Sequence, residues 1–72
     1  MGRRLLQQKR ELAKILKAQV EAEYGVTIEF NPDESKNPIL ELILEIFRQG
    51  QENGWPLLTE IISQLLKILI SI

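Results

Sequence analysis

Two segments in the second half of this 72-residue chain carry more apolar surface than one face of a helix can hold. On a helical wheel, apolar residues sweep about 200° within residues 38–53 and about 220° within residues 56–71. A surface helix in a small single domain typically needs an apolar stripe of somewhat over ~100°. We therefore expect these segments to be covered by more than the rest of their own chain.

Apolar residues recur with helical spacing through most of the sequence. Gly25 and Asn53-Gly54 have the residue types that end helices, whereas Pro38 and Pro56 have the type that begins them. Gly50, in the last turn of its helix, is expected to leave room for the indole of Trp55. The pattern predicts three helices, over residues 3–24, 38–53 and 56–71. Residues 68–72 also alternate as a strand does, but the preceding pattern favours a helix.

Residues 26–30, with the sequence VTIEF, alternate apolar and polar side chains and predict a short strand. No other segment offers this strand a partner, and an unpaired strand edge invites pairing with another chain. We therefore expect it to pair, antiparallel, with the same segment of a second molecule about a two-fold axis. The alternative is an extended connector whose apolar side chains fold down onto the helices. Residues 31–37 are expected to form an irregular loop.

Leaving four leucine or isoleucine side chains exposed forfeits roughly 1.5–3 kcal/mol each. That loss is comparable with the whole stability of a small domain, ~5–15 kcal/mol. The predicted fold is one mainly α domain, residues 1–72, ordered helix–short strand–helix–helix and assembled as a homo-oligomer. A two-fold dimer is favoured, although a trimer or a ring suits wide apolar faces equally. The predicted oligomer interface consists of Val26, Ile28, Phe30, Leu58, Ile62, Leu65 and Leu69.

Catalytic chemistry has little support in the composition, because the chain contains neither cysteine nor histidine. Glu41 and Glu45 have the spacing of a carboxylate-bridged metal site, but no histidine accompanies them and a solvated helix face is the better interpretation. The four glycines are scattered and form no phosphate-binding loop. We therefore predict no enzyme, no catalytic or metal-binding residue, no cofactor and no small-molecule ligand.

The protein is expected to be soluble, and to be cytoplasmic if it is made in a bacterial host. Residues 1–10 are polar and basic rather than a secretory signal, and no apolar run approaches the ~20 residues that span a membrane. The apolar third helix also suggests a peptide that lies on a membrane surface. Such helices usually carry a polar face rich in lysine and arginine, and this one has Lys67 alone.

Charge is divided unevenly along the sequence. Residues 1–20 have a balance of +5 and residues 21–72 a balance of −6. A basic segment is typical of nucleic-acid binding, but this one has no aromatic residue for stacking and its apolar residues are helically spaced. The preferred interpretation is an amphipathic helix with a basic solvent face beside acidic neighbours, and nucleic acid is not an expected partner.

The order of elements in residues 25–72 resembles that of the ribbon-helix-helix repressors, which are small dimers whose paired strands enter the DNA major groove. That resemblance implies Thr27 and Glu29 as the residues facing the bases, where a glutamate near phosphates is unfavourable. The alternative function is therefore a small dimeric DNA-binding regulator or antitoxin.

The sequence also resembles de novo designed helical homo-oligomers. Met1 is the only methionine, cysteine and histidine are absent, and the helix cores are almost wholly leucine and isoleucine. Proline or glycine marks nearly every predicted boundary, so local preference and pattern agree along most of the chain. This resemblance implies a structural protein whose function is self-assembly and whose only partner is itself.

Overall fold

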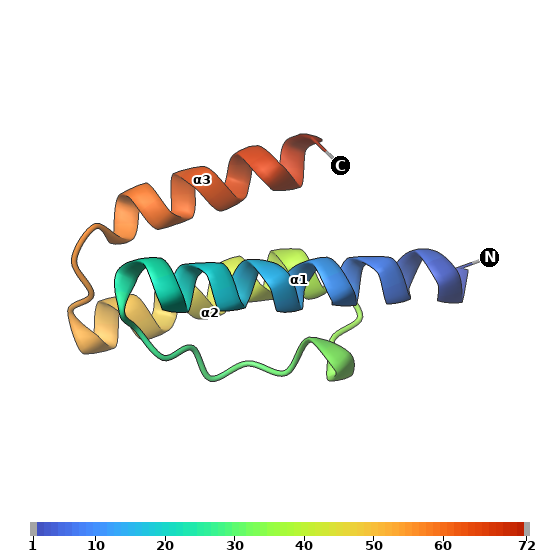
Figure 1. Cartoon of the computed structure of the whole chain (residues 1–72), viewed down its shortest axis with the longest axis horizontal. Helices are drawn as coiled ribbons and strands as arrows, with labels where there is room; N and C mark the ends of the chain where they lie inside the picture. Colours follow the sequence, from blue (N-terminus) through green and yellow to red (C-terminus); the bar gives the residue numbers. More distant parts are fainter. Residues whose placement is uncertain (1, 72) are drawn as a thin grey trace.

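The computed structural model describes residues 2–71 of the chain (Figure 1). Its elements are the helix α1 over Gly2–Tyr24, a 3₁₀ turn η1 over Pro32–Glu34, and the helices α2 over Pro38–Asn53 and α3 over Leu58–Ser71. The prediction of a mainly α protein is confirmed. Helix α3 begins two residues later than the sequence pattern indicated, and it continues through residues 68–71 as a helix.

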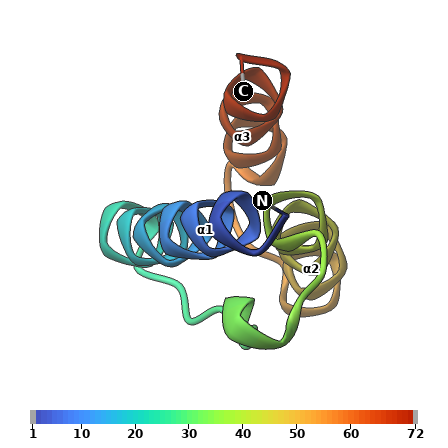
Figure 2. The ribbon, with the colours of Figure 1, turned by 90° about the vertical axis from the view of Figure 1, so that its right-hand side faces the viewer.

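Helices α1 and α2 lie side by side and run in the same direction, and α3 runs in the opposite direction across one face of the pair (Figures 1 and 2). The connection from α1 to α2, with η1 at its end, passes along the opposite face of that pair. A parallel pair of helices needs such a connection, since the chain must return along the whole pair before the second helix begins. An extended segment covers that distance with the fewest residues, at ~3.3–3.6 Å per residue.

The predicted strand over residues 26–30 is wrong. Residues 25–37 connect the two parallel helices, and the stretch described, residues 2–71, contains no strand. Ile28 is 2% exposed and anchors the connection in the core. The backbone groups expected to bond a second molecule are bonded to side chains of the same molecule: Ile28 N–H donates to Glu21 Oε2 at 2.8 Å, and Glu29 bonds Gln49. Because residues 26–30 form no strand, the predicted helix–strand–helix–helix order and the predicted pairing of that strand between subunits are also wrong.

One core joins the three helices and the connection. Helix α2 supplies the largest share of it because α1 and the connection cover one part of its circumference and α3 covers another. The buried apolar side chains are Ala13, Leu16 and Val20 of α1, Ile28 of the connection, Ile39, Leu42, Ile43 and Ile46 of α2, and Ile61 and Leu65 of α3.

Gly54 ends α2 in the left-handed conformation, with φ at +66°. Three residues later Leu57 also has a positive φ, +60°, which is uncommon for a residue with a side chain. The Leu57 carbonyl then accepts the first hydrogen bond of α3, from Ile61 N–H at 3.0 Å. These two left-handed residues reverse the chain between α2 and α3.

At Gly50 a side chain of α3 packs directly on the backbone of α2. A Cβ atom at Gly50 would lie 2.5 Å from Leu58 Cδ1. The room left by this glycine is therefore taken by Leu58, not by the Trp55 indole that the sequence suggested. The N-terminal end of α3 is held against α2 here, whereas its axis tilts away from the helix pair toward the C-terminal end (Figures 1 and 2).

Candidate interaction surface

The basic side of α1 is occupied by contacts within the molecule. Lys14 forms its closest ion pair with Asp33 in η1, and this hydrogen bond raises the pKa of Lys14 despite the opposing effect of desolvation. The basic residues of this side and their partners are Arg10 with the Ser35 carbonyl at 3.1 Å, Lys14 with Asp33 at 2.9 Å, and Lys17 with Glu21 at 3.9 Å. Arg10 and Lys14 hold the connection against α1, whereas the Lys17 pair lies within α1 and involves Glu21, which accepts a hydrogen bond from Ile28 of the connection.

The two carboxylates with metal-site spacing have separate structural roles. Glu41 accepts hydrogen bonds from the Ser35 hydroxyl and from the Asn37 N–H, and so helps to fix the start of α2. Glu45 accepts from Arg48 Nη2 at 2.9 Å and from Gln49 Nε2 at 3.1 Å, and these bonds lower the pKa of Glu45. Across residues 2–71, no three acidic, cysteine or histidine side chains come together where a metal ion would bind. In the same stretch, no helix has the length and apolar character needed to cross a membrane.

Large apolar side chains remain uncovered along the outer sides of α2 and α3. In each helix they are spaced three or four residues apart, so they line one side of the helix. They are between 37% and 84% exposed. We define the open face as these five residues: Leu40, Leu44 and Phe47 of α2, with Leu66 and Ile70 of α3.

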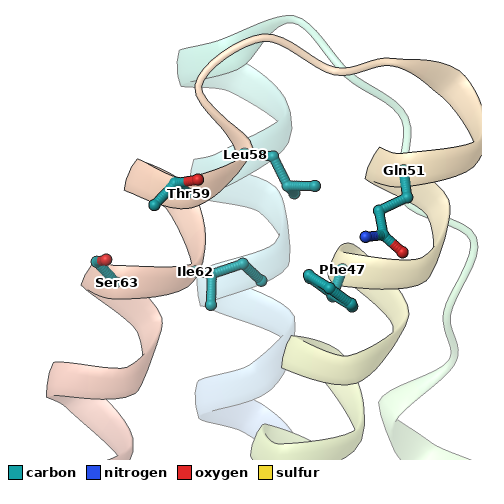
Figure 3. Close-up of a pocket in the computed structure, with 6 residues that line it drawn as sticks. All are labelled: Phe47, Gln51, Leu58, Thr59, Ile62 and Ser63. Carbon is teal, nitrogen blue, oxygen red and sulfur yellow. The ribbon is translucent and has the colours of Figure 1, made fainter.

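A pocket of about 270 Å³ lies at one end of the open face, between α2 and α3 (Figure 3). Leu58 and Ile62 project from α3 toward Phe47, and Gln51 closes the α2 side. The complete lining is Phe47, Gln51, Leu58, Thr59, Ile62 and Ser63. The pocket is therefore apolar inside, and its polar lining residues carry no charge.

The shape of this surface follows from how α3 is attached. Gly50 lets Leu58 pack close to the α2 backbone, and Ile61 and Leu65 are buried in the core. Beyond Leu65 the tilt of α3 carries its last turns away from the α1–α2 pair (Figures 1 and 2). Leu66 and Ile70, on the outer side of these turns, consequently lack cover.

The seven residues predicted as an oligomer interface are divided by the structure. Ile28 and Leu65 are buried in the core of the single molecule. Leu58 and Ile62 line the pocket, so the structure brings these two together beside the open face. The remaining three, Val26, Phe30 and Leu69, are half-buried against the core, with Val26 and Phe30 on the connection rather than near the pocket.

The prediction omitted Leu40, Leu44, Phe47, Leu66 and Ile70, which form the open face. The signal that could have found the first three was the apolar sweep of about 200° on the second helix. That sweep is wide enough for two separate contacts, and the three exposed residues lie at one margin of it.

Comparison with known proteins adds no relative, since no family model, no curated protein and no solved structure matches this chain.

Proposed function

We propose that this chain is a structural protein that self-associates, and that the open face is where a second copy binds. The observation that carries the proposal is the open face itself, with five large apolar side chains that the molecule leaves uncovered. Contiguous apolar patches on small proteins mark interaction sites. The proposed state is a homodimer without catalytic activity.

Charge supports a second copy as the partner. The polar residues that line the pocket, Gln51 of α2 and Thr59 and Ser63 of α3, are uncharged. Glu41 and Arg48, the charged residues nearest Leu44, lie at the margin of the face and have opposite signs. Two identical charged faces would repel or bury a charge, at a cost that hydrogen bonding must offset. The apolar residues of the open face and the uncharged pocket lining meet their copies without that cost, and closed two-fold dimers are the commonest homo-oligomers.

The energies predict a reversible dimer rather than a permanent one. Fully burying a leucine, isoleucine or phenylalanine contributes roughly 1.5–3 kcal/mol, so covering the exposed half of each contributes about 1 kcal/mol. Ten such side chains, five from each copy, contribute on the order of 10 kcal/mol against an association cost of ~4–15 kcal/mol. Because the two quantities are similar, the population of dimer depends on protein concentration.

The alternative prediction, a ribbon-helix-helix-like DNA-binding regulator, has less support. Three of the six basic side chains of α1, those of Arg10, Lys14 and Lys17, are paired with the Ser35 carbonyl, Asp33 and Glu21. Both backbone groups of Glu29 are bonded to Gln49. The resemblance to designed helical proteins concerns origin and remains a prediction; it agrees with self-assembly as the function.

The experiment is sedimentation velocity from about 1 μM to about 1 mM. Dissociation constants in this range correspond to association free energies of roughly −8 to −4 kcal/mol. The wild-type mass should rise with concentration from that of one chain, 8.3 kDa, to that of two. Leu44→Glu, on the open face, should remain monomeric. The matched control is Ile15→Glu on α1, because Ile15 is 54% exposed and Leu44 is 56% exposed; this control should dimerise as the wild type does.

A wild-type chain that stays at 8.3 kDa throughout the range would overturn the proposal. Equal loss of dimer in Leu44→Glu and Ile15→Glu would place association elsewhere and overturn the assignment of the open face. Fluorescence anisotropy with duplex DNA at low salt tests the alternative, and binding that weakens steeply with added salt would favour it.

A further inference from the structure

Helix α3 forms one wall of the pocket and also bears an exposed side chain, Ile70, of a kind that could fill it. Ile70 is the most exposed large apolar residue of the described chain, at 84%. Ile62 lines the pocket, eight residues earlier on the same side of the helix, and Leu66 lies midway between them. Residues four apart on a helix are neighbours on one face, so these three form a continuous row about 12 Å long.

We infer that two copies pack their α3 helices antiparallel about a two-fold axis at Leu66, so that Ile70 of each copy fills the pocket beside Ile62 of the other. This inference rests on the proposed self-association and specifies its geometry. In an antiparallel pair about a two-fold axis, facing residues lie equally far on either side of the residue at the axis. Leu66 therefore faces Leu66 of the second copy, and the Ile62–Ile70 contact is made twice.

The pocket has the size and chemistry for a side chain. Its volume of about 270 Å³ is below the ~300–1,000 Å³ typical of small-molecule sites. Phe47, Leu58 and Ile62 make its apolar wall, and Thr59, Ser63 and Gln51 are uncharged. An aliphatic side chain such as Ile70 buries its surface there without leaving a charge unpaired.

The charged residues of α3 do not obstruct this contact. Glu60 and Lys67 lie about 120° and 100° around the helix from Leu66, so neither faces the second copy at the axis, and Lys67 stands beside the Ile70 end of the row. Leu40 and Leu44 are exposed and line the same side of α2 as Phe47, which faces the pocket, so they extend the contact along α2. The geometry therefore covers the open face of both copies with one symmetric interface.

Charge complementation at position 66 tests the two-fold axis. Leu66 is 41% exposed, so a charged residue fits there without entering the core. Leu66→Glu alone and Leu66→Lys alone should each dimerise at least about a hundredfold more weakly, because like charges meet at the axis. An equimolar mixture should restore a dimer containing one of each, since only a residue that faces its own copy is rescued by the opposite charge at the same position. Circular dichroism of each variant checks that the helices remain folded.

The outcomes separate this inference from the proposed function. A wild-type chain that never dimerises overturns both. A wild-type dimer whose two position-66 variants associate normally overturns only the geometry. Loss of dimer in both variants without rescue in the mixture also overturns the geometry, because it places Leu66 in the interface but away from the axis.

Disulfide trapping provides a second measurement, since the chain has no cysteine of its own. Leu66→Cys should form a disulfide-linked dimer under mild oxidation. Ile62→Cys and Ile70→Cys should link to each other when mixed, and neither should link efficiently to itself, because a disulfide needs Cα atoms within about 7 Å. Efficient self-linking of Ile70→Cys would indicate parallel helices and overturn the inference.

Discussion

The side chain of Gln49 bonds both backbone groups of Glu29: its Nε2 donates to the Glu29 carbonyl at 2.9 Å, and its Oε1 accepts from the Glu29 N–H at 3.0 Å. A neighbouring strand would satisfy these two groups in the same way. Gln49 is itself buried, and its Nε2 also donates to Glu45 at 3.1 Å. One amide side chain thus attaches the extended connection to α2 and removes the need for a strand partner.

Gln49→Ala should destabilise the protein by about 2–3 kcal/mol, because it leaves the Glu29 N–H and carbonyl without their partner in a partly buried place. Urea denaturation at low protein concentration measures the change, and hydrogen exchange should be faster at the Glu29 amide. Gln64→Ala, at an exposed position of α3, is the matched control and should change stability by less than about 0.5 kcal/mol. Similar stability losses in both variants would show that the Gln49 bonds are dispensable.

Gly50→Ala should be destabilising even though alanine favours a helix by ~0.5–1 kcal/mol over glycine. The new Cβ would lie 2.5 Å from Leu58 Cδ1 and 3.1 Å from Leu58 Cγ, and overpacking of this kind costs typically ~1–3 kcal/mol. In a Leu58→Ala background the obstacle is gone, so the same change should become stabilising. A double-mutant cycle in urea measures both effects. If Gly50→Ala is still destabilising in the Leu58→Ala background, Leu58 is not what excludes a side chain at position 50.

Leu57→Asn should stabilise the protein by about 0.5–1 kcal/mol. Leu57 has φ at +60° and is 61% exposed, so its backbone is strained while its side chain contributes little packing. Asparagine tolerates the left-handed conformation and is favoured just before a helix. Leu57→Val is the control of opposite sign, since a β-branched residue suits this conformation worst. If Leu57→Val unfolds at a higher temperature than Leu57→Asn, the backbone at position 57 is not strained in the way proposed.

The ion pair of Glu45 and Arg48 should contribute stability that is lost in acid. Hydrogen bonds from Arg48 and Gln49 hold the pKa of Glu45 below its ordinary value of ~4.3 in the folded chain. A lowered folded-state pKa means that the contribution is complete above the unfolded-state pKa and disappears as pH falls through the folded-state pKa. The stability difference between the wild type and Arg48→Gln should therefore shrink between about pH 5 and pH 3. A difference that stays constant in urea titrations across this range would contradict the assignment.

The sequence was sufficient to predict the helices. Apolar periodicity, Pro38 at the start of α2 and Gly54 after its end are local signals, and the structure has helices where they indicated. The error over residues 26–30 arose because alternation of apolar and polar residues has two physical causes. A half-buried strand produces it, and so does an extended connection with Ile28 anchored below and Glu29 exposed above.

The partner of the connection could not be predicted, because it depends on the relative direction of two helices. Parallel packing of α1 and α2 brings Gln49 beside Glu29, 20 residues earlier in the chain. Similarly, the wide apolar sweep of residues 38–53 indicated that two surfaces were needed but not which residues α1 would leave uncovered. Leu44 and Phe47 stay exposed because α1, the connection and α3 cover other parts of the circumference of α2.

The proposal that a second copy covers the open face is tested most directly by an isotope-filtered nuclear Overhauser experiment. A mixture of ¹³C-labelled and unlabelled chains reports only contacts between different copies. At concentrations where the dimer predominates, we expect intermolecular contacts from Phe47, Leu66 and Ile70 and none from Ile15 on α1. Intermolecular contacts confined to α1, or to Val26 and Phe30 of the connection, would contradict it.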